Sequence, residues 1–284
     1  MRHERTAALT LVPGRRAALV LAVLAVLAAA GCRTGRNYTS IEGPRYTGSP
    51  AIAHTGECAH DQKLRLASFN IEFALRVDSA IAVLQSDPAL RGADVILLQE
   101  MDESSTKRIA DTLGMGYVYY PAVFHLRTRR NFGNAVLSRW PIAEDKKIVL
   151  PHLARLASTQ RAATAATVRV CDLLVRVYSV HLGTPAGVSP AARRDQLGVI
   201  LADASQYSRV VIGGDMNDEG VGRTALKLGY AWPTRRGPPT TGLGRLDHIF
   251  LKGFSSPDSA AAGTVLDVRG ASDHLAVWTV GVLR

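Results

Sequence analysis

The segment that most constrains this chain is Arg209–Asn217, where a short apolar run leads through two glycines to an acid and an amide. An apolar run of this length, bounded by glycines, is typical of a strand buried on both faces. Asp215 and Asn217 lie two positions apart, so on an extended backbone their side chains point to the same side. The glycines let that edge approach a ligand closely. Taken alone, the segment is equally a strand followed by an ordinary Asp–Asn turn.

The first residues are predicted to be an export signal and not part of the fold. Arginines precede an uncharged stretch, Ala17–Ala30, which is too short to span a bilayer comfortably and leads into Gly31-Cys32. A cysteine directly after small residues resembles the bacterial lipobox, in which Cys32 is lipidated and residues 1–31 are removed. An ordinary secretory signal or an uncleaved anchor is the alternative. We expect an exported lipoprotein, anchored to a membrane and facing the periplasm or the cell exterior.

The charge of the remaining chain is positive. The whole sequence carries a formal net charge of +10, and about +7 remains without residues 1–31. This balance favours polyanionic partners such as nucleic acid or phosphorylated lipid headgroups, although genome bias also produces arginine-rich chains. Some 250 residues suffice for one large domain with a sizeable core. In an exported chain Cys58 and Cys171 either form a disulfide or remain as free buried thiols.

A change of composition near Lys63 divides the mature chain. The preceding segment is rich in Gly, Pro, Thr and Ser and has no apolar periodicity, so residues 32–62 are predicted to be a flexible tether and residues 63–284 a single domain. Helices are expected at Asp78–Gln85, at Ser104–Leu113 with Ser104 as N-cap, and after Ser189-Pro190. Strands are expected at Leu64–Ile71, Asp94–Glu100, Asn131–Ile142, Thr164–Val170, Leu173–Leu182, Arg245–Leu251 and Leu275–Val282.

Polar residues recur at the ends of these strands. Four lie at C-terminal ends and two at N-terminal starts, namely Asn70, Glu100, His181 and Asp215, then Asp247 and His274. If the second group of strands runs antiparallel to the first, all six meet at one edge and line a single cleft. Oxygen ligands such as those of Asn70 and Glu100 suit Mg²⁺, which shares its remaining sites with water and phosphate. The sequence has neither the Cys/His spacing of a zinc site nor a Gly-x-Ser-x-Gly elbow.

Eight short motifs occur in a fixed order between Leu64 and Val282. They are Asn70-Ile71-Glu72, Leu98-Gln99-Glu100, Gly133–Ser138, Gln160-Arg161-Ala162, Val180-His181-Leu182, Gly214–Asn217, Arg245–Ile249 and Ser272-Asp273-His274. The series resembles the endonuclease/exonuclease/phosphatase superfamily, with its DNase-I-like fold. The resemblance implies an α/β (α+β) four-layer sandwich of two mixed β-sheets flanked by helices. It also implies attack of water on a phosphoester, with Mg²⁺ or Mn²⁺ as cofactor.

The resemblance also implies a role for each matching residue. Asn70 and Glu100, with Glu72 as a further carboxylate, would hold the metal. Asp247 would orient His274, which acts as a general base or proton carrier. The remaining positions would serve the water and the phosphate: Asp215 and Asn217 at the nucleophile and the transition-state oxygens, His181, Arg161 and Asn134 at the phosphate, and Asp273 assisting at the metal.

The sequence departs from the family pattern at two places, of which the first affects a loop and the second bears on the substrate. Ala276 stands where many relatives carry proline, and Arg245–His248 lacks the signature of the inositol-phosphate 5-phosphatases. A nuclease-like phosphodiesterase is the leading hypothesis, with Arg127, Arg129, Arg130, Arg235 and Arg236 as candidate contacts to nucleic-acid phosphates or as a solvated basic surface. The alternatives are a sphingomyelinase-like phospholipase C or another phosphoesterase on lipid or sugar phosphates, and a non-catalytic binding protein. No obligate protein partner is evident.

Overall fold

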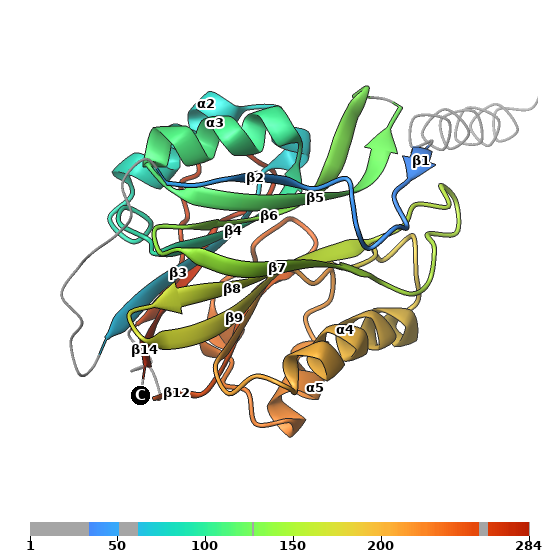
Figure 1. The fold of residues 1–284 in the computed structure, drawn as a ribbon. Coiled ribbons are helices and arrows are strands. Elements are labelled where there is room, and N and C mark those ends of the chain that lie inside the picture. Colours follow the sequence, from blue (N-terminus) through green and yellow to red (C-terminus); the bar gives the residue numbers. More distant parts are fainter. Residues whose placement is uncertain (1–33, 51–61, 127, 256–260, 284) are drawn as a thin grey trace, which may run out of the picture.

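A computed structural model describes residues 34–50, 62–126, 128–255 and 261–283, which form two β-sheets packed face to face with helices on both outer sides (Figure 1). The predicted signal peptide, the lipidation site Cys32 and the cysteine Cys58 lie outside these ranges. Within them, no helix is long and apolar enough to cross a membrane. Cys171 is disulfide-bonded.

The first sheet combines the early and the last strands of the domain. Its order is β1 (Thr34–Asn37), β5 (Gly116–His125), β6 (Arg130–Ser138), β4 (Val95–Met101), β3 (Lys63–Asn70), β14 (Val277–Leu283) and β12 (Phe254–Ser255). Two short strands join its margins, β2 (Tyr46–Gly48) on β5 and β13 (Ala262–Thr264) on β14. Strands β3 and β4 are parallel and the other pairs are antiparallel. The sheet is therefore mixed, as the sequence predicts.

The second sheet has the order β11 (Asp247–Lys252), β10 (Val210–Asp215), β9 (Leu173–His181), β8 (Ala162–Val170) and β7 (Ile142–Val149). It is also mixed, because β9 and β10 are parallel and its other pairs are antiparallel. Helices α4 (Pro190–Ala204) and α5 (Gly222–Lys227) flank this sheet, with the short η2 (Pro233–Arg236) beyond them in the chain. Helices α2 (Val77–Ser86) and α3 (Glu103–Leu113) cover the first sheet (Figure 1), and η1 (Glu72–Ala74) follows β3.

Alternation along the central strands builds three apolar layers. In β4, Val95 and Leu97 face the other sheet, whereas Ile96 and Leu98 face α2 and α3. In β10 the same alternation sends Val211 between the sheets and its neighbours toward α4. Side chains of alternate residues point to opposite faces, so both central strands are apolar on both sides. The result is the four-layer sandwich that the sequence predicts.

Strand direction brings the predicted site residues to one edge. Strand β10 pairs with parallel β9 so that Asp215 lies opposite His181, and with antiparallel β11 so that Asp215 lies opposite Asp247. In the first sheet β14 runs antiparallel to β3, which returns the segment before β14 to the end of β3 that carries Asn70. The expectation that the two groups of strands run in opposite directions is confirmed.

Part of the predicted tether is ordered structure. Strands β1 and β2 pair with β5, and Arg45 forms an ion pair with Asp145 of β7 at 2.5 Å. The prediction of a flexible tether is therefore wrong for residues 34–50. Isolated strands of three or four residues carry too little apolar periodicity to be recognised, and the edge of β5 supplies their hydrogen-bond partners.

The helix termini agree with the sequence in one case and differ in another. Ser189 caps α4, and its side chain accepts a hydrogen bond from the Ala192 backbone N–H, as predicted. Helix α3 is capped not by Ser104 but by Asp102, which accepts from the Ser105 backbone N–H at 2.7 Å. Both residue types are good N-caps, and the position of the preceding strand decides between them.

A substitution at Gly214 tests how closely the backbone beside Asp215 approaches β9. Its φ is +148°, and a Cβ there would lie 1.8 Å from the carbonyl oxygen of Val180 in β9. We expect Gly214→Ala to lower the free energy of unfolding by about 3 kcal/mol, a fall of about 6–12 °C in melting temperature. Gly198→Ala is the matched control, because nothing lies within 4 Å of that Cβ. In the middle of α4 this substitution should raise stability by about 0.5–1 kcal/mol. Equal effects of the two substitutions, measured by calorimetry, would contradict the close approach of β10 to β9.

Candidate active site

The carboxylate of Asp215 is the centre of the polar cluster at the shared edge of the sheets. Its Oδ2 lies 3.2 Å from Nδ2 of Asn70, 3.2 Å from Nδ2 of Asn217 and 3.2 Å from Nε2 of His181. Its Oδ1 accepts the backbone N–H of Asn217 at 2.9 Å. Asp215 is 2% exposed. Four donors from two strands and a turn thus hold one buried carboxylate.

Glu100 enters the cluster through an irregularity in β4. Its φ is +61°, and the pairing of β4 with β6 shifts register between Leu98 and Met101. The bulge re-aims the side chain so that Oε1 accepts from Nδ2 of Asn70 at 3.2 Å and Oε2 accepts from the Phe73 backbone N–H at 2.9 Å. Bulges of this kind commonly direct a side chain into an active site. Asn70 therefore bridges the carboxylates of the two sheets.

His181 is buried and fixed on both ring nitrogens. Nη1 of Arg161 donates to its Nδ1 at 3.2 Å, and its Nε2 donates to Asp215. The neutral ring with hydrogen on Nε2 is the form that matches these partners. Burial, and next the positive charge of Arg161, lower the pKa of His181 well below its ordinary value. His181 is therefore neutral at physiological pH.

His274 has the opposite electrostatic character. Its Nδ1 lies 2.9 Å from Oδ2 of the fully buried Asp247, and its Nε2 lies 3.8 Å from Oδ2 of Asp215. Burial alone would lower its pKa, but the hydrogen bond to Asp247 and the charges of Asp247 and Asp215 raise it to about 10. The Ser272 hydroxyl accepts the backbone N–H of His274 at 3.1 Å and donates to the carbonyl of Asn70 at 2.7 Å. The last loop is thereby attached to β3.

The cluster holds more negative charge than its own cations balance. Burial raises the pKa of Glu100, and burial together with the charge of Asp247 raises the pKa of Asp215 to about 7. Oδ1 of Asp247 is buried without a hydrogen-bond partner. Ligand atoms of Asp215, Asp247 and His274 lie within 4.8 Å of one another. These oxygen-rich groups fit a hard divalent cation such as Mg²⁺ or Mn²⁺, which offsets the surplus negative charge.

The orientation of Asn70 differs from that expected of a metal ligand. Its Nδ2, not its oxygen, faces the two carboxylates, and its Oδ1 accepts the Glu72 backbone N–H at 3.2 Å. Binding a cation through Oδ1 beside Glu100 therefore needs the amide to turn over. The amide and the two carboxylates are nevertheless close enough to share one ion.

Three of the predicted residues lie away from this cluster. The carboxylate of Glu72 borders a neighbouring pocket of about 320 Å³ with Thr128 and Arg130, and it makes no hydrogen bond to the cluster. Asp273 is exposed and only its charge reaches His274. Asn134 is buried, donates to the carbonyl of Ala162 at 2.6 Å and leaves its Oδ1 without a partner. The structure does not bring these three side chains together with the other eight.

A family model describes this chain over most of its length. It is the model of the Endonuclease/Exonuclease/phosphatase family, and it matches residues 67–274. The chain belongs to the endonuclease/exonuclease/phosphatase family. The matched range contains all residues of the cluster. A search of curated proteins finds no match.

Solved structures of the family share the fold of this chain. The family protein from Bacteroides vulgatus gives a TM-score of 0.64 at 15% identity, over 79% of this chain and 100% of that one. A family protein from Beutenbergia cavernae gives a TM-score of 0.60 at 21% identity, over 78% of this chain and 72% of that one. The D. rerio TDP2 structure is described as complexed with a single-strand DNA product. It gives a TM-score of 0.60 at 18% identity, over 78% of this chain and 99% of that one. At these identities the likeness shows the fold.

Sequence reasoning missed the aromatic side chains beside the cluster. The Phe132 ring lies 5.8 Å from that of His181 and 5.1 Å from that of Phe73, and the Arg161 guanidinium lies 5.4 Å from its centroid. The alternation of β6 predicts that Phe132 is buried but not what it contacts. Phe73 has φ of +54°, a conformation that its local sequence does not indicate.

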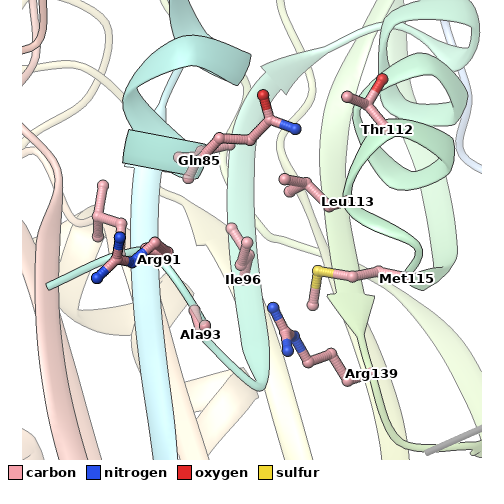
Figure 2. Close-up of a pocket in the computed structure, with 11 residues that line it drawn as sticks. Gln85, Arg91, Ala93, Ile96, Thr112, Leu113, Met115 and Arg139 are labelled. Atoms are coloured by element: carbon pink, nitrogen blue, oxygen red, sulfur yellow. The ribbon is translucent and has the colours of Figure 1, made fainter. Parts of the chain in front are cut away.

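A second concavity lies between α2, α3 and β4 and contains none of the predicted site residues (Figure 2). It measures about 250 Å³, with Ile96, Leu113 and Met115 among its apolar lining and Arg91 and Arg139 at its border. Neither acids nor histidines line it. The family's chemistry is therefore assigned to the cluster around Asp215.

The proton on His274 gives a direct test of this geometry. In metal-free protein we expect the ring to titrate with a pKa of about 10, and Asp247→Asn to lower this pKa, since burial remains while the hydrogen bond and the charge of Asp247 are lost. A raised pKa in the folded state stabilises the fold below pH 6.5, and this stabilisation is lost as the pH rises through 10. Histidine NMR titration in the presence of a chelator measures the pKa of His274 in the wild-type and Asp247→Asn proteins. An unchanged titration in Asp247→Asn would refute the pairing.

Proposed function

We propose that this protein is a divalent-metal-dependent phosphodiesterase that hydrolyses phosphoester bonds with an activated water. Its charge and its site favour a nuclease-like enzyme. The observation that carries the proposal is the meeting of Glu100, Asp215, His181 and the Asp247–His274 pair at one edge of both sheets. Members of its family are phosphoester hydrolases. A non-catalytic binding protein would not need to keep this costly arrangement of buried charge.

In this proposal the residues of the second sheet prepare the water. The raised pKa of Asp215 makes this carboxylate a better proton acceptor than an ordinary aspartate near neutral pH. The amide of Asn217 donates to Asp215 and to the carbonyl of Leu182, so it fixes the carboxylate beside the turn. Asp215 therefore orients the attacking water and takes its proton.

The two histidines would serve the phosphate in different protonation states. His274, protonated at neutral pH and held by Asp247, directs Nε2–H at the phosphoryl oxygens or the leaving oxygen. This favours the proton carrier among the two roles that the sequence suggests for it. Neutral His181 would turn its Nε2–H from Asp215 toward a phosphate oxygen, and Arg161 adds a fixed positive charge beside it. Preorganised donors of this kind stabilise the charge that develops in the transition state.

A cation would be held by Glu100 and Asn70, or by the neighbouring carboxylates of Asp215 and Asp247. When bound, it supplies positive charge for the phosphoryl oxygens. Glu72 and Asp273 remain predicted to act at the metal. This role requires that substrate or metal draws their loops toward the cluster. Asn134 and Arg161 stay as predicted phosphate contacts.

Nucleic acid is the substrate that we propose. The net charge of about +7 without residues 1–31 supports it, and so does the single-strand DNA product named for the TDP2 neighbour. Arg129, Arg130, Arg235 and Arg236 are exposed, and Arg130 makes an ion pair with Asp102 at 3.3 Å. Arg127 lies outside the described residues. Exposed arginines can contact successive phosphates, which makes binding fall as salt rises.

Exposed leucines support a second candidate, a phospholipase C of the sphingomyelinase type. Leu75, Leu156 and Leu243 are 58%, 78% and 82% exposed, on segments next to Phe73, Arg161 and Asp247. Apolar side chains around a catalytic mouth fit a lipid surface. The proposed lipid anchor at Cys32, which would place the exported enzyme on a membrane, suits this candidate as well.

A substrate panel tests the proposed reaction. We expect the protein to cleave single-stranded oligonucleotide or plasmid DNA with Mg²⁺ or Mn²⁺, and to lose this activity in chelator. RNA, sphingomyelin vesicles and inositol phosphates complete the panel. Hydrolysis of vesicles without cleavage of nucleic acid would replace the nuclease by the phospholipase. Metal-independent hydrolysis, or none of any phosphoester, would refute the proposal.

Removal of either histidine should nearly abolish hydrolysis while the fold persists. We expect His181→Ala and His274→Ala each to lower kcat by about 10²–10³, the usual effect of losing one well-placed donor. His152→Ala is the control, because that ring is exposed and bonds to Asp195 outside the cluster. Circular dichroism checks folding. Full activity of either cluster variant would show that its role is misassigned.

A further inference from the structure

An apolar pocket opens directly beside the candidate phosphate-binding residues. It measures about 330 Å³, and Glu100 and Arg161 stand at its catalytic end. The rest of its lining is largely apolar and comes from η1, β5, β6 and two loops: Phe73, Val123, His125, Phe132, Ala154, Leu156, Ala157, Thr159, Thr184, Ala186 and Gly187. Pockets of this size with apolar walls and a few charged groups at one end hold one moiety of a ligand.

Aromatic rings form one wall of this pocket. The ring of Phe73 lies 5.1 Å from that of Phe132 and 5.1 Å from that of His125, and both pairs are tilted. Phe132 in turn supports the guanidinium of Arg161. Flat rings offer their faces to another flat ring, and stacking of a base on such a wall needs no particular base.

Two loops that also line the pocket are bonded to each other and to β1. The backbone N–H of Arg155 donates to the carbonyl of Gly187 at 2.9 Å. The side chain of Asn37 donates to the carbonyl of Ser158 at 2.8 Å and accepts the backbone N–H of Gln160 at 3.0 Å. The pocket is thus a preformed slot, and the segment expected to be a tether helps to shape it.

We propose that this pocket receives the base of a nucleotide whose phosphate lies at Arg161 and His181. The proposal rests on the proposed function. A phosphodiester bound there directs one of its two ester groups past Glu100 into the slot, where ring-lined walls and small residues suit a planar group better than a branched or flexible one. A base can enter only when it is unpaired. The pocket therefore selects single-stranded or frayed nucleic acid over duplex, with little preference for sequence.

Filling the slot separates this role from the chemistry. Ala186 lines the pocket and is exposed, so Ala186→Trp places an indole in the space of the base without disturbing the core. Ala191→Trp is the matched control, because Ala191 is exposed on α4 and does not line the pocket. The substrates are short single-stranded oligonucleotides with one cleavable linkage, carrying either both neighbouring bases or an abasic sugar on one side of that linkage.

We expect the abasic sugar on one side to lower kcat/KM about tenfold with the wild-type and Ala191→Trp proteins, and to have no effect with Ala186→Trp. Ala186→Trp should itself lower kcat/KM on the complete oligonucleotide by a similar factor. Equal kcat/KM with and without each base, or an undiminished base dependence in Ala186→Trp, would overturn the proposal. So would a loss of activity in Ala186→Trp that is confined to sphingomyelin vesicles, which would assign the slot to a lipid.

A binding measurement keeps this test independent of hydrolysis. In chelator, an oligonucleotide with 2-aminopurine should change its fluorescence on binding to the wild-type protein and not on binding to Ala186→Trp. The same response from both proteins contradicts the pocket proposal even if the protein is a phosphodiesterase. The expected difference without hydrolysis of any phosphoester would uphold the pocket and refute the proposed function.

Discussion

The contact on which the site depends is the convergence of four donors on the buried carboxylate of Asp215. This residue ends β10, the strand that lies between parallel β9 and antiparallel β11. His181 and Asp247 reach it because their strands arrive from opposite directions at the same edge, and Asn70 reaches it from the other sheet. Gly213 and Gly214 make this approach possible, since a Cβ on either would press against Leu97 or Val180. Packing of the two sheets and assembly of the site are thus one event.

The site stores conformational strain as well as charge. Glu100 and Asn217 have φ of +61° and +50°, and Glu72 and Phe73 are also in the left-handed region. Such residues cost free energy and persist where the surrounding structure holds them. Here the hydrogen bonds of Glu100 to the Phe73 backbone and of Asn217 to the Leu182 carbonyl do so. The acids are held in place before a ligand arrives, as electrostatic catalysis requires.

Apolar periodicity predicts the central strands from sequence, and local residue types predict the cap of α4 and the six strand-end residues of the cluster. These signals are local in the chain. Other features depend on distant partners. Strand β5 contains Pro121, which argues against a strand, yet a register shift between Pro121 and Val123 accommodates it. Strand β1 pairs with β5, and its Asn37 is bonded to Ser158 and Gln160. Glu72 looks like a ligand from its spacing to Asn70, but the turn of η1 carries its carboxylate away. The pocket beside Glu100 is built from five separate segments, and no single one of them indicates it.

The central claim is that carboxylates brought together by the fold are balanced by a divalent cation. Thermal unfolding with increasing Mg²⁺ or Mn²⁺ tests it without a substrate, since a ligand of the folded state raises stability with its concentration. We expect the melting temperature of the wild-type protein to rise with the concentration of either ion. We also expect Glu100→Gln to be more stable than the wild type without metal and to gain less from it. A melting temperature that does not change with either ion would show that no cation balances these carboxylates. An equal rise of the melting temperature in Glu100→Gln would show the same for Glu100.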